Sequence, residues 1–272
     1  MDHRRRLVLS VGVAIAAADF FGCASSSSVS DAARHALAPT GSLRVGLYEG
    51  SPSSILSGGA VGHERGVGND LGKALAERLG VPFQPVVFPK NTDVLAGIKA
   101  GTLDVTFTNA SPERTRSMDF TPTFMDVEKG FLVGPGSRIG SLDEIKRPGL
   151  RIGVSEGSTT EGELGPQFPA ALMVRTPTLK AAIGMLGAGK LDAFATNKAI
   201  LFEMSDELPA SRVLSGSWGM EHFAAAIPKG REAHLGIVSA FVANAVADGT
   251  VARAVARAGL RGAVAPARPW SP

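Results

Sequence analysis

The chain contains one short passage twice, in the same order and far apart. Residues 100–110 read AGTLDVTFTNA, and residues 188–199 read AGKLDAFATNKA. In each copy a Leu-Asp pair opens a largely apolar run and a Thr-Asn pair closes it: Leu103-Asp104 and Thr108-Asn109, then Leu191-Asp192 and Thr196-Asn197. An earlier match precedes each copy, because LRVGLYEGSP at 43–52 is similar to LRIGVSEGST at 150–159. Two matches in the same order favour a duplicated unit over the chance similarity of common α/β sequences.

Both copies lie among alternating strand-like and helix-like segments. In the first half, apolar and β-branched runs predict strands at 43–48, 82–88 and 102–108, and amphipathic spacing predicts helices at 69–80 and 91–101. The second half repeats this order, with strands at 150–155, 171–175 and 191–196 and a helix at 178–188. The β-α-β-α-β order predicts an α/β fold with mostly parallel sheets flanked by helices.

The ends of the first two helices carry capping residues. We expect Asn69 or Asp70 to cap the first helix, and Asn91 or Thr92 to cap the second. Gly80 and Gly101 are placed to end them.

The repeated Thr-Asn pairs and the two Glu-Gly-Ser turns follow predicted strands. In open parallel α/β sheets, ligands bind beyond the carboxyl ends of strands, where helix N-termini offer free N–H groups. If the two halves face one another, these ends enclose one cleft. The duplication then predicts that each lobe supplies one wall of a shared site.

The N-terminus is typical of an export signal. Basic Arg4-Arg5-Arg6 precedes an apolar run at 7–18 that is too short to span a bilayer. We interpret residues 1–23 as a signal peptide of the Sec or twin-arginine type, which directs the protein to the periplasm. A buried N-terminal helix is the alternative.

Cys23 is the only cysteine, so the chain cannot form an internal disulfide. Gly22-Cys23-Ala24-Ser25 resembles a bacterial lipobox, although Phe20 and Phe21 depart from it. The favoured interpretation is lipid attachment at Cys23, and the alternative is ordinary cleavage nearby. Residues 24–41 would then form a flexible tether, with the folded body starting near Ser42.

The body offers no sign of other partners. The net charge of +3 is spread over mixed basic and acidic residues without a basic stripe, so nucleic acid is not expected. Metal-binding and cofactor-binding motifs are also absent from the sequence, which predicts no metal and no cofactor. Contact with a membrane is expected only through the lipid anchor.

From about Leu43 to Leu260 the chain resembles the family 3 extracellular solute-binding proteins of bacterial ABC importers. The most specific segment is TNASPERTRSMDFTP at 108–122, supported by GVGNDLGKALAERLG, the Gly-Ser-Thr turn at 157–159 and IPKGREAHL at 227–235. The resemblance implies a two-lobed type II periplasmic binding fold with its ligand cleft between the lobes. It also implies a membrane permease as partner, hinge closure on a small carboxylate-bearing solute (a polar amino acid or related organic acid), and a monomer.

The resemblance also gives domain boundaries. Residues 42–127 and 222–262 are expected to form lobe 1, 128–221 lobe 2, and 263–272 a C-terminal tail. The two chain crossings are expected near 126–129 and 221–224.

Carried over from the family, Arg114 corresponds to the arginine that grips the ligand carboxylate, a role that suits its two-pronged donor geometry. Thr108 and Asn109 fall where the family presents polar groups to the ligand. Ser158 and Thr159 match the turn of the second lobe that reaches the same carboxylate, although such a turn is also common helix-capping material.

The chain departs from the family at several of these positions. It has Gly66-Val67-Gly68 where Gly-Phe-Asp is usual, and Ser51-Pro52-Ser53-Ser54 where an aromatic residue is expected. Asn197 stands where an aspartate holds the ligand's α-ammonium. Either Glu49, Glu156 or Glu221 compensates, or the ligand lacks an ammonium group; the sequence favours the second alternative, with Glu49 kept as a candidate ligand contact.

An enzyme and a ligand sensor are the rival functions. Some proteins of this fold are cyclohexadienyl dehydratases, and the residues that could serve in acid–base chemistry are Glu49, Glu156, Glu221 and His222. Lone carboxylates and histidines are usually structural or solvated, so no catalytic residue is assigned and transport is favoured.

Overall fold

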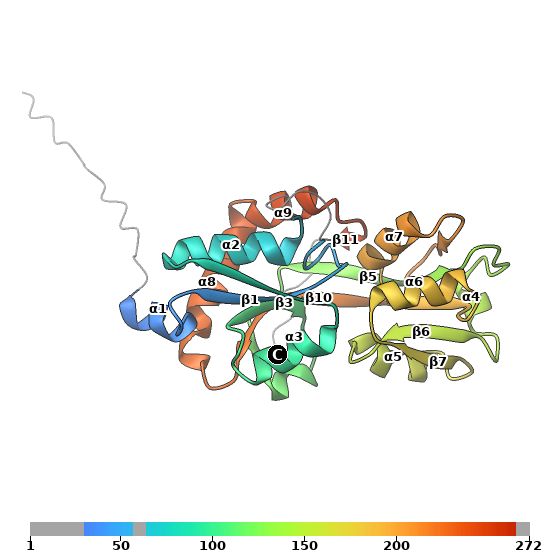
Figure 1. The fold of residues 1–272 in the computed structure, drawn as a ribbon, viewed down its shortest axis with the longest axis horizontal. Coiled ribbons are helices and arrows are strands. Elements are labelled where there is room, and N and C mark those ends of the chain that lie inside the picture. The colour runs from blue at the N-terminus through green and yellow to red at the C-terminus, as the bar shows by residue number, and fades with distance from the viewer. Residues whose placement is uncertain (1–29, 57–63, 265–272) are drawn as a thin grey trace, which may run out of the picture.

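The computed structural model describes residues 30–56 and 64–264. It is an α/β structure with two halves arranged along its long axis (Figure 1). The export signal 1–23 and Cys23 lie outside the described residues. Among the described helices, none alone is long and apolar enough to cross a membrane; the bent pair Glu232–Ala247 and Thr250–Ala258 passes that test only jointly, by length and composition.

The first half contains a three-stranded parallel unit. Its elements are β1 (Leu43–Tyr48), α2 (Val67–Leu79), β2 (Phe83–Phe88), α3 (Asn91–Lys99) and β3 (Val105–Asn109). Strand β1 pairs in parallel with both β2 and β3. The predicted elements are confirmed, and Gly80 ends α2 in a left-handed conformation.

The predicted helix caps are wrong. Helix α2 begins earlier than expected, with Gly66 as its N-cap, and so Asn69 and Asp70 lie inside the helix. Helix α3 begins at Asn91 itself, after Lys90, and no side chain caps it.

The second half repeats the unit. Its elements are β6 (Arg151–Ser155), α5 (Thr159–Gln167), β7 (Leu172–Thr176), α6 (Leu179–Gly187), β8 (Ala193–Asn197) and α7 (Lys198–Glu207). Strand β6 pairs in parallel with β7 and β8, just as β1 pairs with β2 and β3. The duplication in the sequence is therefore a duplication of structure.

One pair of duplicated residues, an arginine and an aspartate, makes the same internal contact in each half. The backbone N–H and guanidinium of Arg44 donate to Asp104, with Nη2 to Oδ1 at 2.7 Å. Arg151 and Asp192 make the same set of bonds, again with Nη2 to Oδ1 at 2.7 Å. These bonds connect the start of β1 to the residue before β3, and the start of β6 to the residue before β8. This part of the repeat therefore stabilises the fold and does not form the pocket.

The repeated glycines leave room for the repeated leucines that pack against them. A Cβ on Gly46 would lie 2.6 Å from Leu103 Cδ1, and a Cβ on Gly153 would lie 2.6 Å from Leu191 Cδ1. Because no Cβ fits at that distance, the strand residue facing each leucine has to be a glycine.

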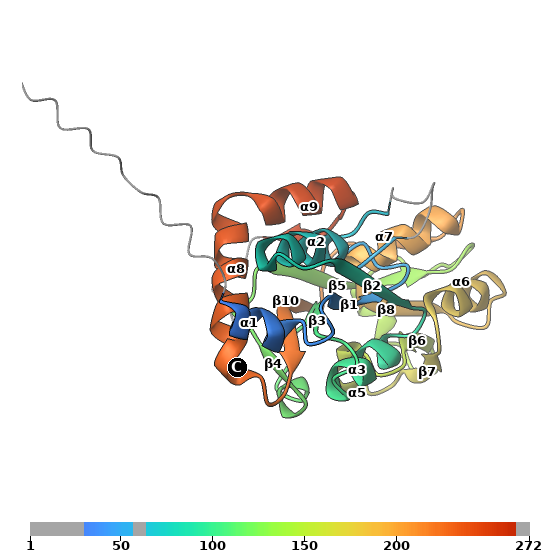
Figure 2. The ribbon, with the colours of Figure 1, turned by 60° about the vertical axis from the view of Figure 1, so that its left-hand side comes forward.

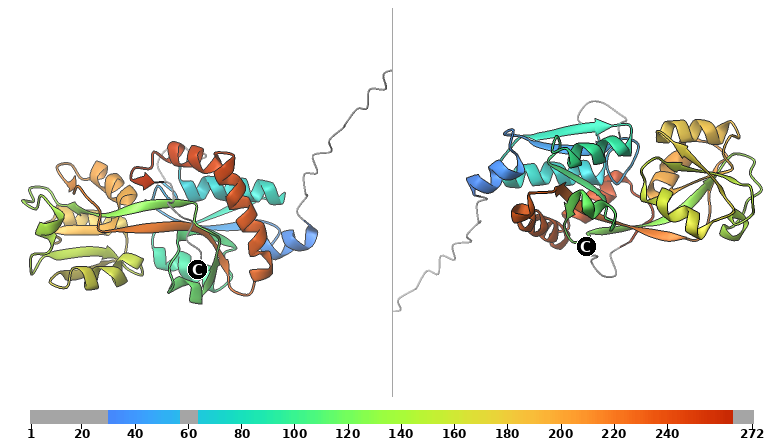
Figure 3. Two further views of the ribbon diagram at one scale, coloured as in Figure 1. Left: turned by 180° about the vertical axis from the view of Figure 1, so that it is seen from behind. Right: turned by 90° about the horizontal axis from the view of Figure 1, so that it is seen from below.

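Two long strands connect the halves. Strands β5 (Met125–Val133) and β10 (Gly219–Pro228) are antiparallel to each other, with β10 also pairing with β3 and β5 with β8. Figure 3 shows them passing from one half to the other. The main path of the sheet has the order β2-β1-β3-β10-β5-β8-β6-β7. Each half thus contains a parallel three-stranded unit, as predicted, and the antiparallel connecting strands make the sheet as a whole mixed. The expected crossings at 126–129 and 221–224 fall within these two strands.

The C-terminal helices return to the first half. Helices α8 (Leu235–Ala247) and α9 (Thr250–Ala258) pack near α2 (Figure 2), and Val238 and Ala254 share a buried core with Leu71. A separate core around Phe131 and Ile152 lies in the second half. This arrangement is consistent with the predicted lobes 42–127 plus 222–262 and 128–221, whose boundaries stay a prediction.

The two ends of the described chain are more ordered than expected. Helix α1 (Asp31–Leu37) lies within the predicted tether 24–41, and it buries Ala33 and Leu37. The folded body thus begins before Ser42. Strand β11 (Ala263–Val264) pairs with β5, so the predicted tail 263–272 starts with a strand. The shorter elements are β4 (Met118–Phe120), α4 (Leu142–Ile145) and β9 (Arg212–Val213).

Candidate functional site

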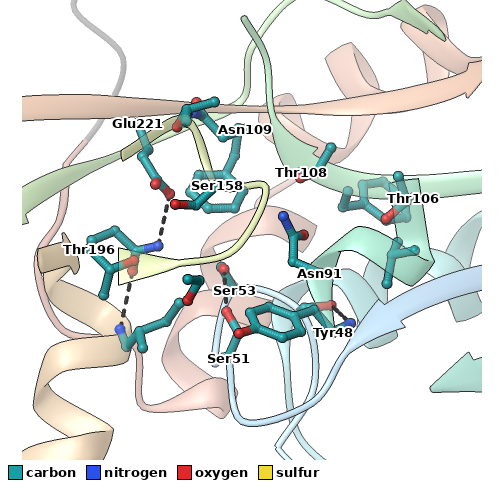
Figure 4. Close-up of a pocket in the computed structure, with 18 of the residues that line it drawn as sticks. Tyr48, Ser51, Ser53, Asn91, Thr106, Thr108, Asn109, Ser158, Thr196 and Glu221 are labelled. Atoms are coloured by element: carbon teal, nitrogen blue, oxygen red, sulfur yellow. Dashed lines mark hydrogen bonds between the residues drawn. The ribbon is translucent and has the colours of Figure 1, made fainter. Parts of the chain in front are cut away.

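A polar pocket lies between the two halves, with a volume of about 60 Å³ (Figure 4). Both halves contribute to its wall. The contributions of the first half come from the ends of β1 and β3, and those of the second from the ends of β6 and β8 and the start of α5. Carboxyl ends of parallel strands meet at this pocket, as the sequence predicts.

Six of the seven residues proposed as ligand contacts come together in this pocket: Thr108, Asn109, Arg114, Ser158, Thr159 and Asn197. Glu49 does not. Its side chain is exposed and borders a separate hollow with Thr178 and Lys180, so its assignment to this site is corrected. Glu49 follows the end of β1, and the pocket wall resumes only at Ser51.

Arg114 lies on the short 3₁₀ helix η1 (Arg114–Arg116) and is 9% exposed. Its Nη1 donates to Thr108 Oγ1 at 3.1 Å and to the Asn109 carbonyl at 2.9 Å, and its Nη2 donates to the Gly157 carbonyl at 3.4 Å. Burial lowers the pKa of the Arg114 guanidinium, and the nearby Glu221 opposes that effect. The bonds hold a cation at the boundary between the halves.

Asn109 and Thr159 meet across the pocket. The Asn109 amide donates to Thr159 Oγ1 at 2.8 Å, while its Oδ1 accepts from the His222 backbone N–H at 2.7 Å. Ser158 caps α5 by accepting from the Glu161 N–H at 3.2 Å. The Gly-Ser-Thr turn therefore performs its common capping role and also forms part of the pocket wall.

Asn197 has two partners, and both of its bonds are buried. As the N-cap of α7, its Oδ1 accepts from the Ile200 N–H at 3.1 Å. Its Nδ2 donates to Glu221 Oε2 at 2.8 Å. The amide is therefore not an exposed strand end, since it joins a helix N-terminus to an acidic side chain in the pocket.

Glu221 is 6% exposed, and burial raises the pKa of its carboxyl group. Lys129, the Asn197 amide and Arg114 act in the opposite direction. Lys129 is fully buried on β5, with its ammonium 2.6 Å from Glu163 Oε2 and 5.4 Å from the centre of the Trp218 ring. Lys129 and Glu163 thus act electrostatically on the buried pair Arg114 and Glu221, although only that pair lines the pocket.

The sequence interpretation missed several polar lining residues: Tyr48, Ser51, Ser53, Asn91, Thr106 and Ser155. Tyr48 stands at the end of β1, a few residues before the serine-rich segment in which the expected aromatic residue is replaced. Its position at a strand end was the signal that could have found it. Burial raises the pKa of the Tyr48 hydroxyl, an effect that Ser155 opposes.

The other acid–base candidates lie outside the pocket wall. Glu156 is exposed, and the His222 ring is paired with Asp126 at 2.8 Å. Within residues 30–56 and 64–264, no group of three His, Cys, Asp or Glu side chains is arranged to hold a metal ion.

A family model described as bacterial extracellular solute-binding proteins, family 3, matches residues 43–259. The chain is also similar to a glutamine-binding protein of an ABC transporter from Bacillus subtilis (strain 168), with 26% identity over 137 residues, 50% of each chain. It thus spans about half the length of the curated relatives it matches.

Solved structures of amino-acid-binding proteins share the fold. One, a substrate-binding protein of an amino-acid ABC transporter from Streptococcus pneumoniae bound to L-arginine, has a TM-score of 0.74 at 20% identity, covering 85% of this chain and 99% of that one. Another is an ancestral amino-acid-binding protein described as a precursor of cyclohexadienyl dehydratase. Its TM-score is 0.70 at 24% identity, covering 82% and 98%. The predicted type II periplasmic binding fold is confirmed.

Proposed function

This chain belongs to the bacterial extracellular solute-binding proteins, family 3, and from that premise we propose that it is the substrate-binding protein of an ABC importer. It captures a small amino acid by its carboxylate between the two halves, then delivers it to a membrane permease. The protein acts outside the cytoplasmic membrane, in the periplasm, after export by the signal at residues 1–23. Cys23 is its proposed lipid attachment point.

The observation that carries the proposal is the place of Arg114. A buried guanidinium at the boundary of two halves, beside hydroxyl and amide groups from both, suits a carboxylate that bridges them. Because β5 and β10 are the two connections between the units, bending within them would open and close the pocket.

The test is a binding panel. Thermal-shift measurements and calorimetry on the purified protein would compare amino acids, organic acids and sugars, with Arg114→Lys as the variant that keeps the charge and loses the two-pronged geometry. We expect an amino acid to bind in the micromolar range and Arg114→Lys to weaken it by at least about tenfold. Equal binding by the variant, or preference for a ligand without a carboxylate, would contradict the proposal.

A dehydratase acting on cyclohexadienyl acids is the second candidate. The observation in its favour is the buried Glu221, because a carboxyl group with a raised pKa can serve as a general acid. Incubation of the protein with such acids, followed by detection of aromatic products, separates the two functions. Turnover that is lost in Glu221→Gln would favour the enzyme.

A further inference from the structure

Arg114 and Glu221 are the only charged side chains among the described residues that line the pocket. Each is more than nine-tenths buried. They come from different parts of the chain, since Arg114 follows β3 and Glu221 lies on β10. One cation and one anion at the same pocket suit a ligand that carries both charges.

The bond between Asn197 and Glu221 fixes the position of the anion. Asn197 Nδ2 donates to Glu221 Oε2 at 2.8 Å, and Asn197 is itself held as the N-cap of α7. Figure 4 shows Glu221 near Ser158 and Asn109, on the side of the pocket where the halves meet. The neutral amide at position 197 thus comes with a carboxylate on β10, which lies beyond β5 in the sheet.

We propose that Glu221, held in place by Asn197, is the counter-charge for the ligand's α-ammonium group, and that the ligand is a zwitterionic amino acid with an uncharged side chain. The proposal rests on the proposed function, since it assumes that Arg114 binds the carboxylate of the same ligand. It reverses the preference drawn from the sequence, where the neutral Asn197 favoured a ligand without an ammonium group.

Charge balance supports a zwitterion over a simple anion. The two charged side chains that line the pocket, Arg114 and Glu221, balance each other. A zwitterion leaves this balance unchanged, whereas an organic anion adds one uncompensated negative charge beside Glu221. Buried charges without a counter-charge are strongly unfavourable, so the deaminated acid should bind much more weakly.

The rest of the wall suits a polar, uncharged side chain. Away from Glu221, Figure 4 shows Tyr48, Ser51, Ser53 and Asn91 gathered together. The hydroxyls of Ser51 and Ser53 lie 2.8 Å apart and bond to each other. Hydroxyls and an amide can hydrogen-bond to an amide or hydroxyl, but among the described lining residues they offer no counter-charge to an arginine or glutamate side chain.

The experiment uses matched ligand pairs on the full protein. Calorimetry would compare L-serine, L-asparagine and L-glutamine with the 2-hydroxy acid of each, together with L-arginine and L-glutamate. We expect the tightest of the three amino acids to bind at least about thirtyfold more tightly than its 2-hydroxy acid. L-arginine and L-glutamate should bind more weakly than that amino acid.

Glu221→Gln tests the assigned residue, because it removes the charge and keeps an oxygen for the Asn197 amide. It should weaken binding of the amino acid by at least about tenfold and should not weaken binding of the 2-hydroxy acid, because the like charge beside that anion is removed. Adding Asn197→Asp to that variant should restore much of the preference, because it returns a carboxylate to the same wall. Glu156→Gln, an exposed residue outside the pocket, is the matched control and should change neither ligand.

The outcomes separate this proposal from the proposed function. If Arg114→Lys weakens binding but Glu221→Gln leaves the ratio between amino acid and 2-hydroxy acid unchanged, Glu221 is not the ammonium partner and only this proposal fails. A parent protein that prefers the 2-hydroxy acid overturns it as well. If no amino acid or 2-hydroxy acid binds the parent protein, the proposed function fails, and this proposal with it. Should Glu221→Gln not fold, the same ratio measured with Glu221→Asp decides the question.

Discussion

Asn109 and Thr159 are hydrogen-bonded across the two halves, with Asn109 Nδ2 2.8 Å from Thr159 Oγ1. Asn109 ends β3 and Thr159 begins α5, so the bond joins the last residue of a strand in one unit to the first residue of a helix in the other. A second approach lies nearby, where a Cβ on Gly157 would come within 2.7 Å of Thr92 Cγ2. The two halves are therefore in direct contact beside the pocket.

Thr159→Val should favour an open arrangement, in which the two halves move apart at the pocket. Valine keeps the shape of threonine but cannot accept the Asn109 bond, so ligand affinity should fall by about fivefold, corresponding to about 1 kcal/mol for one hydrogen bond. Calorimetry measures the affinity, and small-angle scattering of the ligand-free protein should show a larger radius of gyration. Thr40→Val, at an exposed site, is the control and should leave both unchanged. An unchanged affinity in Thr159→Val would show that the bond does not contribute to closure.

Gly157→Ala should hinder closure more severely. Gly157 has a φ of +69°, and the added methyl group would meet Thr92 Cγ2. We expect an affinity loss of at least about tenfold from strain and steric conflict together. Thr92→Ser removes the opposing methyl group and should recover part of the loss in the double variant. If the double variant binds no better than Gly157→Ala, the contact between the halves is not the cause.

The two Arg-Asp pairs should differ in their contribution to stability. Asp104 has a fully buried side chain that pairs with both Arg44 and Arg231, whereas the Asp192 side chain is 28% exposed and pairs with Arg151. We expect Asp104→Asn to lower the free energy of unfolding by about 3 kcal/mol and Asp192→Asn by about 1 kcal/mol. Urea denaturation measures both. Equal losses would mean that burial does not set the contribution of each pair.

The Asp192 contribution should also depend on pH. Its hydrogen bonds to Arg151 hold the pKa of the Asp192 carboxyl below its ordinary value. A lowered pKa in the fold adds stability above the ordinary carboxyl pKa, and this stability is lost as the pH falls through the lowered value. The stability difference between parent and Asp192→Asn should therefore be full at neutral pH and shrink in acid. A difference that grows in acid would contradict this assignment.

Much of the fold and most of the proposed contacts could be predicted because they lie in local patterns. Thr108 ends a predicted strand, Asn109, Ser158 and Asn197 lie after predicted strands, and the carboxyl ends of parallel strands meet at one edge. Glu221 could be suggested only as one of three carboxylates. Its partnership with Asn197 depends on β10 lying between β3 and β5, an antiparallel register that no local pattern specifies.

Contacts between strands, which local patterns do not specify, also explain other differences between the sequence prediction and the structure. The contact of Gly46 with Leu103 depends on packing between strands. The repeat was therefore visible in the sequence, but the packing that requires it was not. Tyr48 could not be found from the family's position for an aromatic residue, because this chain places its ring earlier, at the strand end. Glu49 was expected in the site, but it lies after the end of β1 and its exposed side chain borders a different hollow.

Glu221→Gln should have opposite effects on stability and on binding. Burial raises the pKa of the Glu221 carboxyl in the fold, although Lys129, Asn197 and Arg114 favour its ionised form and Glu163 opposes it. A raised pKa adds stability that is fully present below the ordinary carboxyl pKa and is lost as the pH rises through the raised value. At neutral pH, the burial of the Glu221 carboxyl group therefore costs stability in the ligand-free protein. The neutral glutamine avoids this cost and keeps the bond to Asn197.

Without ligand, Glu221→Gln should therefore unfold at a higher temperature than the parent at pH 7, and the difference should fall toward zero near pH 4. With a saturating amino acid at pH 7 the order should reverse, because only the parent gains a charge pair with the ligand. Thermal denaturation at several pH values, with and without the ligand, measures both effects. A ligand-free variant that is less stable than the parent at pH 7 would mean that Lys129 and Arg114 outweigh burial. In that case Glu221 would stabilise the ligand-free fold, and the fold would already supply the counter-charge that is assigned here to the ligand's ammonium group.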